Sequence, residues 1–137
     1  MPLSDILSCD ETMVEAAITS ERPYTIGDWY LAKGISTIEL SKLGEMLKVS
    51  DYDSLMSGFE LVGEPLPEGP WPERIPEVLT AKLRTITDEE IAHVCQPWAK
   101  IEEFFGTVAP ADLVPYLTEL RGFLAANHGP YFVVNAL

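Results

Sequence analysis

The stretch "TDEEIAHVCQPWAKIEEFFG", residues 87–106, carries the clearest helical pattern of the chain. Thr87 and Glu90 have the spacing of a capping box, in which each side chain binds a backbone N–H of the first turn. Apolar residues then recur every three or four positions, the period of one helix face: Ile91, Val94, Trp98, Ile101 and Phe105. We therefore expect a core helix with an acidic outer face, kinked at Pro97 and ended by Gly106.

Helical signals recur on both sides of this stretch. Asp10 is placed to cap a helix over residues 11–20, and Ser36 with Glu39 forms a second capping box before a helix over residues 37–48. Three more helices are expected over residues 52–56, 76–85 and 110–127. Helices therefore account for most of the regular structure that the sequence predicts.

The expected strands are few and short. Residues 59–62 and the C-terminal segment PYFVVNAL are rich in aromatic and β-branched residues, and they could pair with each other. Residues 59–76 hold five prolines and two glycines, so an irregular loop is expected around Trp71. Ser4 is expected to cap a short helical turn. The predicted fold class is mainly α, a compact domain of about five helices with a minor two- or three-strand β element.

Length and charge restrict the possible functions. The chain of 137 residues fits one globular domain, residues 1–137, with a single core. It carries 22 aspartates and glutamates against 9 lysines and arginines, a formal net charge of −13. Binding to nucleic-acid phosphates requires clustered basic residues, so nucleic acid is not an expected partner. An acidic surface instead favours fast association with a basic protein.

The sequence also predicts a location. We expect no signal peptide, because the N-terminal segment has no basic start and no apolar run long enough for one. We expect no transmembrane helix either, because no run of 18 apolar residues is present. Cys9 and Cys95 are far apart in the sequence and are interpreted as reduced thiols of a cytoplasmic protein that does not bind membranes. The alternative is one disulfide in a periplasmic protein whose leader has been removed.

The opening stretch contains possible metal ligands. Glu90 and His93 have the Glu-x-x-His spacing of helical di-iron carboxylate sites. Such a site needs a second copy of the motif, but Ala125 stands three residues before the other histidine, His128. His93 and Cys95 are two positions apart, so a helix would direct them to different sides and a zinc site is not expected either. We therefore predict no metal and no cofactor.

Catalysis would require a nucleophile, a base and an orienting group. Cys95 with His93 or His128 could supply the first two, which leaves a small enzyme open as an alternative. Cys95 lies next to the apolar stripe, where free cysteine commonly serves as a small hydrophobic residue. Glu102 and Glu103 would diverge by about 100° on a helix, so they are poorly placed to share a substrate. We therefore predict no catalytic residues.

A long segment without basic residues indicates a binding face. No lysine or arginine occurs between Lys48 and Arg74, whereas acidic and aromatic residues are interspersed there with prolines. The predicted partner-binding residues are Asp51, Tyr52, Asp53, Glu60, Glu64, Glu68 and Trp71. The acids would attract a basic partner, and Trp71 or Tyr52 would anchor it. The alternative is that Trp71 packs back on the core, because tryptophan is usually well buried.

The segment "GPWPERIPEVLTAKLRTITDEEIAHVCQPWAKIEEF", residues 69–104, resembles a pattern of small bacterial proteins in which Trp and Pro precede a helix. The following helix of that pattern ends in Trp-Ala-x-x-Glu-Glu, which occurs here at residues 98–103. Proteins of this size and charge are similar to immunity proteins, which inhibit a co-produced toxin. The resemblance implies a non-enzymatic protein that occludes a basic partner such as a toxin. An adaptor or assembly subunit, including a homodimer, stays open as a further alternative.

Overall fold

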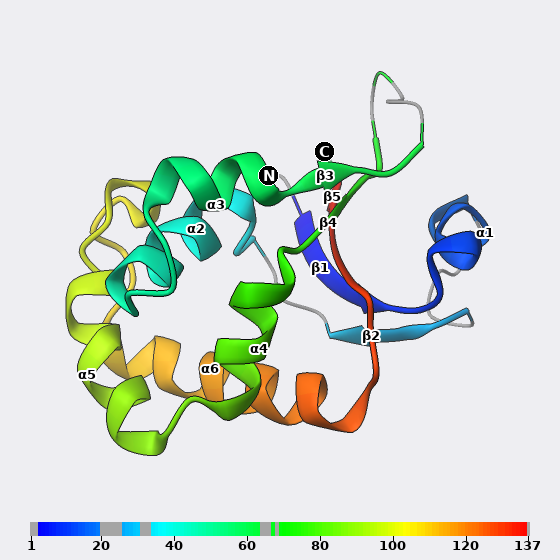
Figure 1. Cartoon of the computed structure of the whole chain (residues 1–137). Helices are drawn as coiled ribbons and strands as arrows, with labels where there is room; N and C mark the ends of the chain where they lie inside the picture. The colour runs from blue at the N-terminus through cyan, green and yellow to red at the C-terminus, as the bar shows by residue number, and fades with distance from the viewer. Residues whose placement is uncertain (1–2, 20–25, 31–33, 64–66, 68, 137) are drawn as a thin grey trace.

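The structure, a computed structural model, describes residues 3–19, 26–30, 34–63, 67 and 69–136. In this part of the chain, six α-helices accompany a five-stranded antiparallel sheet, so the fold class is mixed α/β. The prediction of a mainly α fold with a minor β element is therefore wrong. Figure 1 shows the sheet between a large group of helices on one side and a single short helix on the other.

Two strands from opposite ends of the chain pair at the centre of the sheet. The strands are β1 (Leu3–Ser8), β2 (Asp28–Tyr30), β3 (Glu60–Leu61), β4 (Trp71–Arg74) and β5 (Tyr131–Ala136). Their order is β2-β1-β5-β4-β3, and every neighbouring pair is antiparallel. The expected strands near residues 59–62 and at the C-terminus are confirmed as β3 and β5. Their expected direct pairing is wrong, because β4 lies between them.

Strand β1 is buried on both of its faces, which explains why its sequence lacks the alternating pattern typical of a strand. Ile6 packs into the core on one face of the sheet and Leu7 into the core on the other, so apolar and polar residues do not alternate. Ser4 caps no helical turn, contrary to the prediction. It is buried in β1, and its Oγ donates a 2.7 Å hydrogen bond to Oδ1 of Asn135. Pairing between the chain ends is a long-range event that local sequence does not report.

Proline content explains why β4 was predicted to be loop. Pro72 has no N–H to give to a ladder, and prolines are therefore rare inside sheets. In the structure, Pro72 lies opposite Val134 of β5, and its carbonyl accepts a 2.9 Å hydrogen bond from the N–H of Val62. Pairing on both sides thus holds a short segment extended despite its low strand propensity.

The helices agree with the sequence better than the strands do. They are α1 (Val14–Thr19, preceded by the 3-10 helix η1, Glu11–Met13), α2 (Thr37–Met46), α3 (Tyr52–Gly58), α4 (Glu77–Thr85), α5 (Asp88–Trp98), the 3-10 helix η3 (Glu102–Phe104) and α6 (Pro110–Ala126). Both predicted capping boxes are confirmed, at the start of α2 and of α5. The carboxylate of Glu39 accepts from the N–H of Ser36 at 3.0 Å, and Glu90 accepts from the N–H of Thr87 at 3.0 Å.

The predicted end of α5 is wrong. The helix stops at Trp98, one residue after Pro97, and the chain continues as η3. Leaving the helix changes which side chains face the core: Phe104 is buried, with its ring 5.6 Å from that of Trp98 in an edge-on arrangement. Phe105, expected in the apolar stripe, is 87% exposed.

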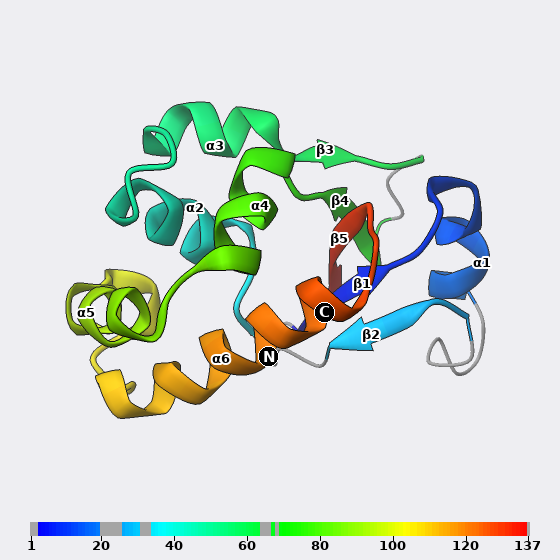
Figure 2. The same ribbon diagram turned by 60° about the horizontal axis from the view of Figure 1, so that its bottom comes forward.

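Two hydrophobic cores flank the sheet. The larger core lies between the sheet and helices α2 to α6, and Trp98 is fully buried in it. The smaller core lies beneath α1 and comprises Leu7, Val14, Ala17, Phe132 and Val134. Figure 2 shows the same division from a second direction, with α1 on the far side of the strands from α5 and α6. In the described part of the chain, no helix combines the length and apolar character needed to cross a bilayer.

Candidate functional site

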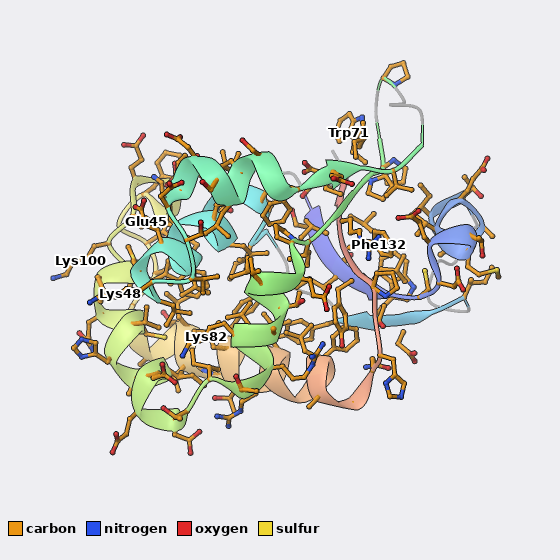
Figure 3. All side chains as sticks on the ribbon, in the orientation of Figure 1. Glu45, Lys48, Trp71, Lys82, Lys100 and Phe132 are labelled. Atoms are coloured by element: carbon orange, nitrogen blue, oxygen red, sulfur yellow. The ribbon has the colours of Figure 1, made fainter. Side chains whose placement is uncertain are left out.

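The structure separates the predicted partner-binding residues into two groups. Tyr52 begins α3, and its N–H donates a 2.8 Å hydrogen bond to the carboxylate of Glu45 on α2. Trp71 begins β4 at the end of the sheet. In Figure 3, Trp71 lies beside the sheet whereas Glu45 lies among the helices at the left, so Tyr52 and Trp71 do not form one face.

The second group lies along the sheet edge. Glu60 is exposed on the edge strand β3, directly opposite Arg74 of β4. Trp71 is half-buried and lies opposite Asn135 of β5. Glu64 and Glu68 lie outside the described residues. The described members of this group therefore flank the β3–β4 connection.

Asp51 has a local structural role. It is the N-cap of α3, and its carboxylate accepts a 2.7 Å hydrogen bond from the N–H of Ser54. Hydrogen bonds from Ser54 lower the pKa of Asp51 below its ordinary value, because they stabilise the charged carboxylate. Asp53, the next acidic residue, is exposed in the first turn of the same helix. Asp53 is thus available to a partner, whereas Asp51 mainly begins the helix.

An ion pair connects α2 with the segment after α5. Nζ of Lys42 lies 2.5 Å from the carboxylate of Glu103 on η3. The hydrogen bond to Glu103 raises the pKa of Lys42, and the carboxylate of Glu102 contributes to the same shift. Helix α2 therefore contacts η3 through Lys42 and the first residue of α3 through Glu45. These two contacts join Tyr52 and Glu103, about fifty positions apart in the sequence, to neighbouring turns of one helix.

Phe105 is the most unusual residue near this ion pair. Its backbone has φ 52° and ψ 27°, the left-handed region that disfavours residues with a Cβ. Its side chain is 87% exposed, so packing against the core does not repay the conformational cost. Strained backbone of this kind is often retained for function.

These residues together define the α3–η3 surface: Glu45, Tyr52, Asp53, Glu102, Glu103 and Phe105. Lys48 and Lys100 lie toward the same end of the molecule as Glu45 (Figure 3). The charge of Lys42 is matched by Glu103, and Glu45, Asp53 and Glu102 are exposed. This end of the molecule thus combines the acidic side chains and the two exposed lysines with one projecting aromatic ring. Sequence reasoning placed Phe105 in the core, although Pro97 and the Phe-Phe-Gly sequence were signals that the helix could end early.

The proposed catalytic and metal-binding residues do not converge. Cys95 is fully buried, and burial raises the pKa of its thiol, whereas His93 on the same helix is exposed. A reactive cysteine needs the opposite environment, one that lowers the pKa. The carboxylate of Glu90 serves the capping box and lies 2.5 Å from Nζ of Lys82. His128 lies beyond α6, in a pocket with Arg84.

Further observations on the described residues concern cysteines and metals. Cys9 and Cys95 are both free thiols, as the sequence predicted. No three histidine, cysteine, aspartate or glutamate side chains of the described segments form a group that could hold a metal ion.

The sequence and the structure were compared with known proteins, and no relative was found. The chain matches no protein-family model, no curated protein and no solved structure.

Proposed function

We propose that this protein is a non-enzymatic binding module of the immunity type, which occludes a basic partner through the α3–η3 surface. The observation that carries the proposal is the 87% exposure of Phe105 in a left-handed backbone conformation. A large exposed aromatic side chain among polar groups is typical of an interface anchor. Its fixed backbone reduces the ordering cost when a partner closes over it.

The charge of the chain supports a basic partner. The net charge is −13, and Glu45, Asp53 and Glu102 are exposed on the proposed surface. Such charges attract an oppositely charged protein over a Debye length of about 8 Å at physiological salt. They would raise the association rate, whereas burial of Phe105 would slow dissociation. Occlusion of a basic cleft by this surface would inhibit the partner without chemistry.

The test begins with a partner identified by affinity capture from the native host, with wild-type protein and the Phe105→Ser variant as parallel baits. Surface plasmon resonance then measures the rates of the purified pair. We expect Phe105→Ser to weaken binding by about 2 kcal/mol, mainly through faster dissociation. The double change Asp53→Asn with Glu102→Gln should lower the association rate and flatten its dependence on salt.

Two controls locate the interface. Val78 on α4 is 59% exposed, so Val78→Ser removes an exposed apolar side chain outside the proposed surface and should leave binding unchanged. Trp71→Ala tests the sheet edge. If Trp71→Ala weakens binding and Phe105→Ser does not, the partner binds at the β3–β4 edge and the proposed surface is wrong. If neither Trp71→Ala nor Phe105→Ser weakens binding of the partner, the proposal is also excluded.

A further inference from the structure

The pocket that contains Arg84 and His128 gathers positive charge in this acidic protein. It has a volume of about 250 Å³ and lies between α4 and the turn that joins α6 to β5. Arg74, Arg84 and His128 line it, together with one carboxylate, that of Glu77. We refer to it as the Arg84 pocket. The chain has nine lysines and arginines in all, so two of them beside a histidine is a local concentration of cationic groups.

Arg84 is held in place by groups that carry no formal charge. Its Nε donates to the carbonyl of Leu124 at 3.3 Å, and Nη2 donates to the hydroxyl of Tyr131 at 3.2 Å. The guanidinium carbon lies 5.7 Å from the centre of the Tyr131 ring. Among the described residues, no carboxylate forms an ion pair with Arg84. A fixed guanidinium without a carboxylate partner is suited to bind an anion.

Three further hydrogen-bond donors of the pocket already have acceptors. The hydroxyl of Tyr131 donates to the carbonyl of Leu124 at 2.6 Å, and the Oγ1 of Thr80 donates to the carbonyl of Glu77 at 3.2 Å. The N–H of Gly129 donates to Oγ of Ser8 at 3.1 Å. An incoming ligand would therefore be recognised by the cationic side chains.

Arg74 supplies the second guanidinium. Its Nη1 lies 3.3 Å from the carboxylate of Glu11, and both side chains are about half exposed. An exposed ion pair of this kind contributes little to stability, so Arg74 can turn toward a stronger anion at small cost. Glu77 opposes any anion in the pocket and should limit its affinity. The imidazole of His128 is exposed at the rim of the pocket.

We propose that the Arg84 pocket binds an oxyanion of the phosphate class, either free phosphate or the phosphate group of a monoester. Two guanidinium groups suit a phosphate better than a carboxylate as the ligand. A phosphate offers more oxygens, arranged as a tetrahedron, and carries more negative charge. A water molecule occupies about 30 Å³ in the liquid, so the pocket has room for a phosphate group with part of its hydration shell.

The test is a titration of the full chain with sodium phosphate, followed by ¹H–¹⁵N NMR at constant ionic strength. We expect saturable shifts of the Gly129 and Tyr131 amides and of the Arg84 Nε–H signal. Arg84→Gln should weaken binding about tenfold, the loss expected for one charge-assisted pair. Glu77→Gln should strengthen binding several-fold, because it removes the opposing charge. Lys100→Gln, a change of an exposed lysine on another part of the chain, should have no effect.

One further variant and two further ligands complete the test. Arg84→Lys replaces Arg84→Gln if the latter does not fold. It keeps the positive charge but should weaken phosphate binding, because the planar set of donors is lost. Phenyl phosphate that binds more tightly than phosphate would identify a monoester as the ligand, whereas equal affinities would identify free phosphate. The proposal would be overturned if acetate bound as tightly as phosphate. It would also be overturned if the chemical-shift changes caused by phosphate were spread over the protein surface and were the same in Glu77→Gln.

Discussion

The indole N–H of Trp98 donates a 2.9 Å hydrogen bond to the backbone carbonyl of Glu39, 59 positions earlier in the chain. This bond joins α5 to α2 inside the larger core, where Trp98 is 0% exposed. The ring also packs against Phe104 and Tyr116, with centroid distances of 5.6 and 6.0 Å. Trp98 therefore connects three helical segments of the core through one side chain.

Substitution of Trp98 should destabilise the protein strongly. Trp98→Ala removes the ring and leaves a cavity, and we expect a loss of about 3–5 kcal/mol in the free energy of unfolding. Trp98→Phe keeps most of the apolar volume but leaves the Glu39 carbonyl without its donor, so a loss of about 1–3 kcal/mol is expected. Urea denaturation of both variants measures the two values. A loss below about 1 kcal/mol for Trp98→Ala would contradict complete burial.

Phe105 should be costly for stability, because an L-residue in the left-handed region is unfavourable by about 1–2 kcal/mol. Glycine carries no such penalty, whereas alanine retains it. We therefore expect Phe105→Gly to be more stable than Phe105→Ala by about 1 kcal/mol, which urea denaturation can measure. Both variants should lose partner binding. Equal stability of the two variants would mean that the backbone at position 105 is not held left-handed.

The sequence predicted most helices because their signals are local. The side chains of Thr87 and Glu90 cap α5 across three residues, and the pattern that identifies them needs no knowledge of the rest of the fold. The strands depend instead on partners far along the chain. Ser4 meets Asn135 across 131 positions, and such a contact leaves no mark on the sequence near Ser4.

The candidate site was predictable only in part for the same reason. Tyr52 and Asp53 were found from the acidic and aromatic composition around them. Their relation to Glu103 depends on α2, whose Glu45 accepts from the N–H of Tyr52 and whose Lys42 pairs with Glu103, and composition does not encode this packing. Trp71 was grouped with Tyr52 because both lie in one acidic segment, but that segment leaves α3 and enters the sheet as β3 and β4, where Trp71 lies.

Two glycines in the C-terminal region should respond in opposite ways to alanine. Gly129 has φ +66°, and an added Cβ would lie 2.8 Å from the ring of Tyr131. Gly129→Ala should therefore cost about 2 kcal/mol or more. Gly122 lies within α6 and has no atom within 4 Å of an added Cβ, so Gly122→Ala should stabilise the protein by about 0.5–1 kcal/mol. Thermal and urea unfolding of the pair provide the comparison, and a stabilising Gly129→Ala would contradict the turn geometry.

The ion pair between Lys42 and Glu103 should make stability depend on pH in the acidic range. The hydrogen bond from Lys42 lowers the pKa of Glu103 in the folded protein below the unfolded value of about 4.3. A depressed carboxyl pKa means that the unfolded chain takes up the proton first as the pH falls. The stabilisation is therefore complete above the unfolded pKa and is lost as the pH falls through the folded pKa.

Lys42→Met tests this ion pair directly. Without the ammonium group, the pKa of Glu103 should rise, which a carboxyl ¹³C NMR titration can follow. The stability difference between wild type and Lys42→Met should be largest near pH 7 and should shrink once the pH falls below about 4.3. Lys100→Met is the matched control, since the described residues offer Lys100 no ion pair, and it should leave the titration of Glu103 nearly unchanged. An unshifted Glu103 titration in Lys42→Met would show that the ion pair does not hold α2 against η3 in solution, and the definition of the α3–η3 surface would then fail with it.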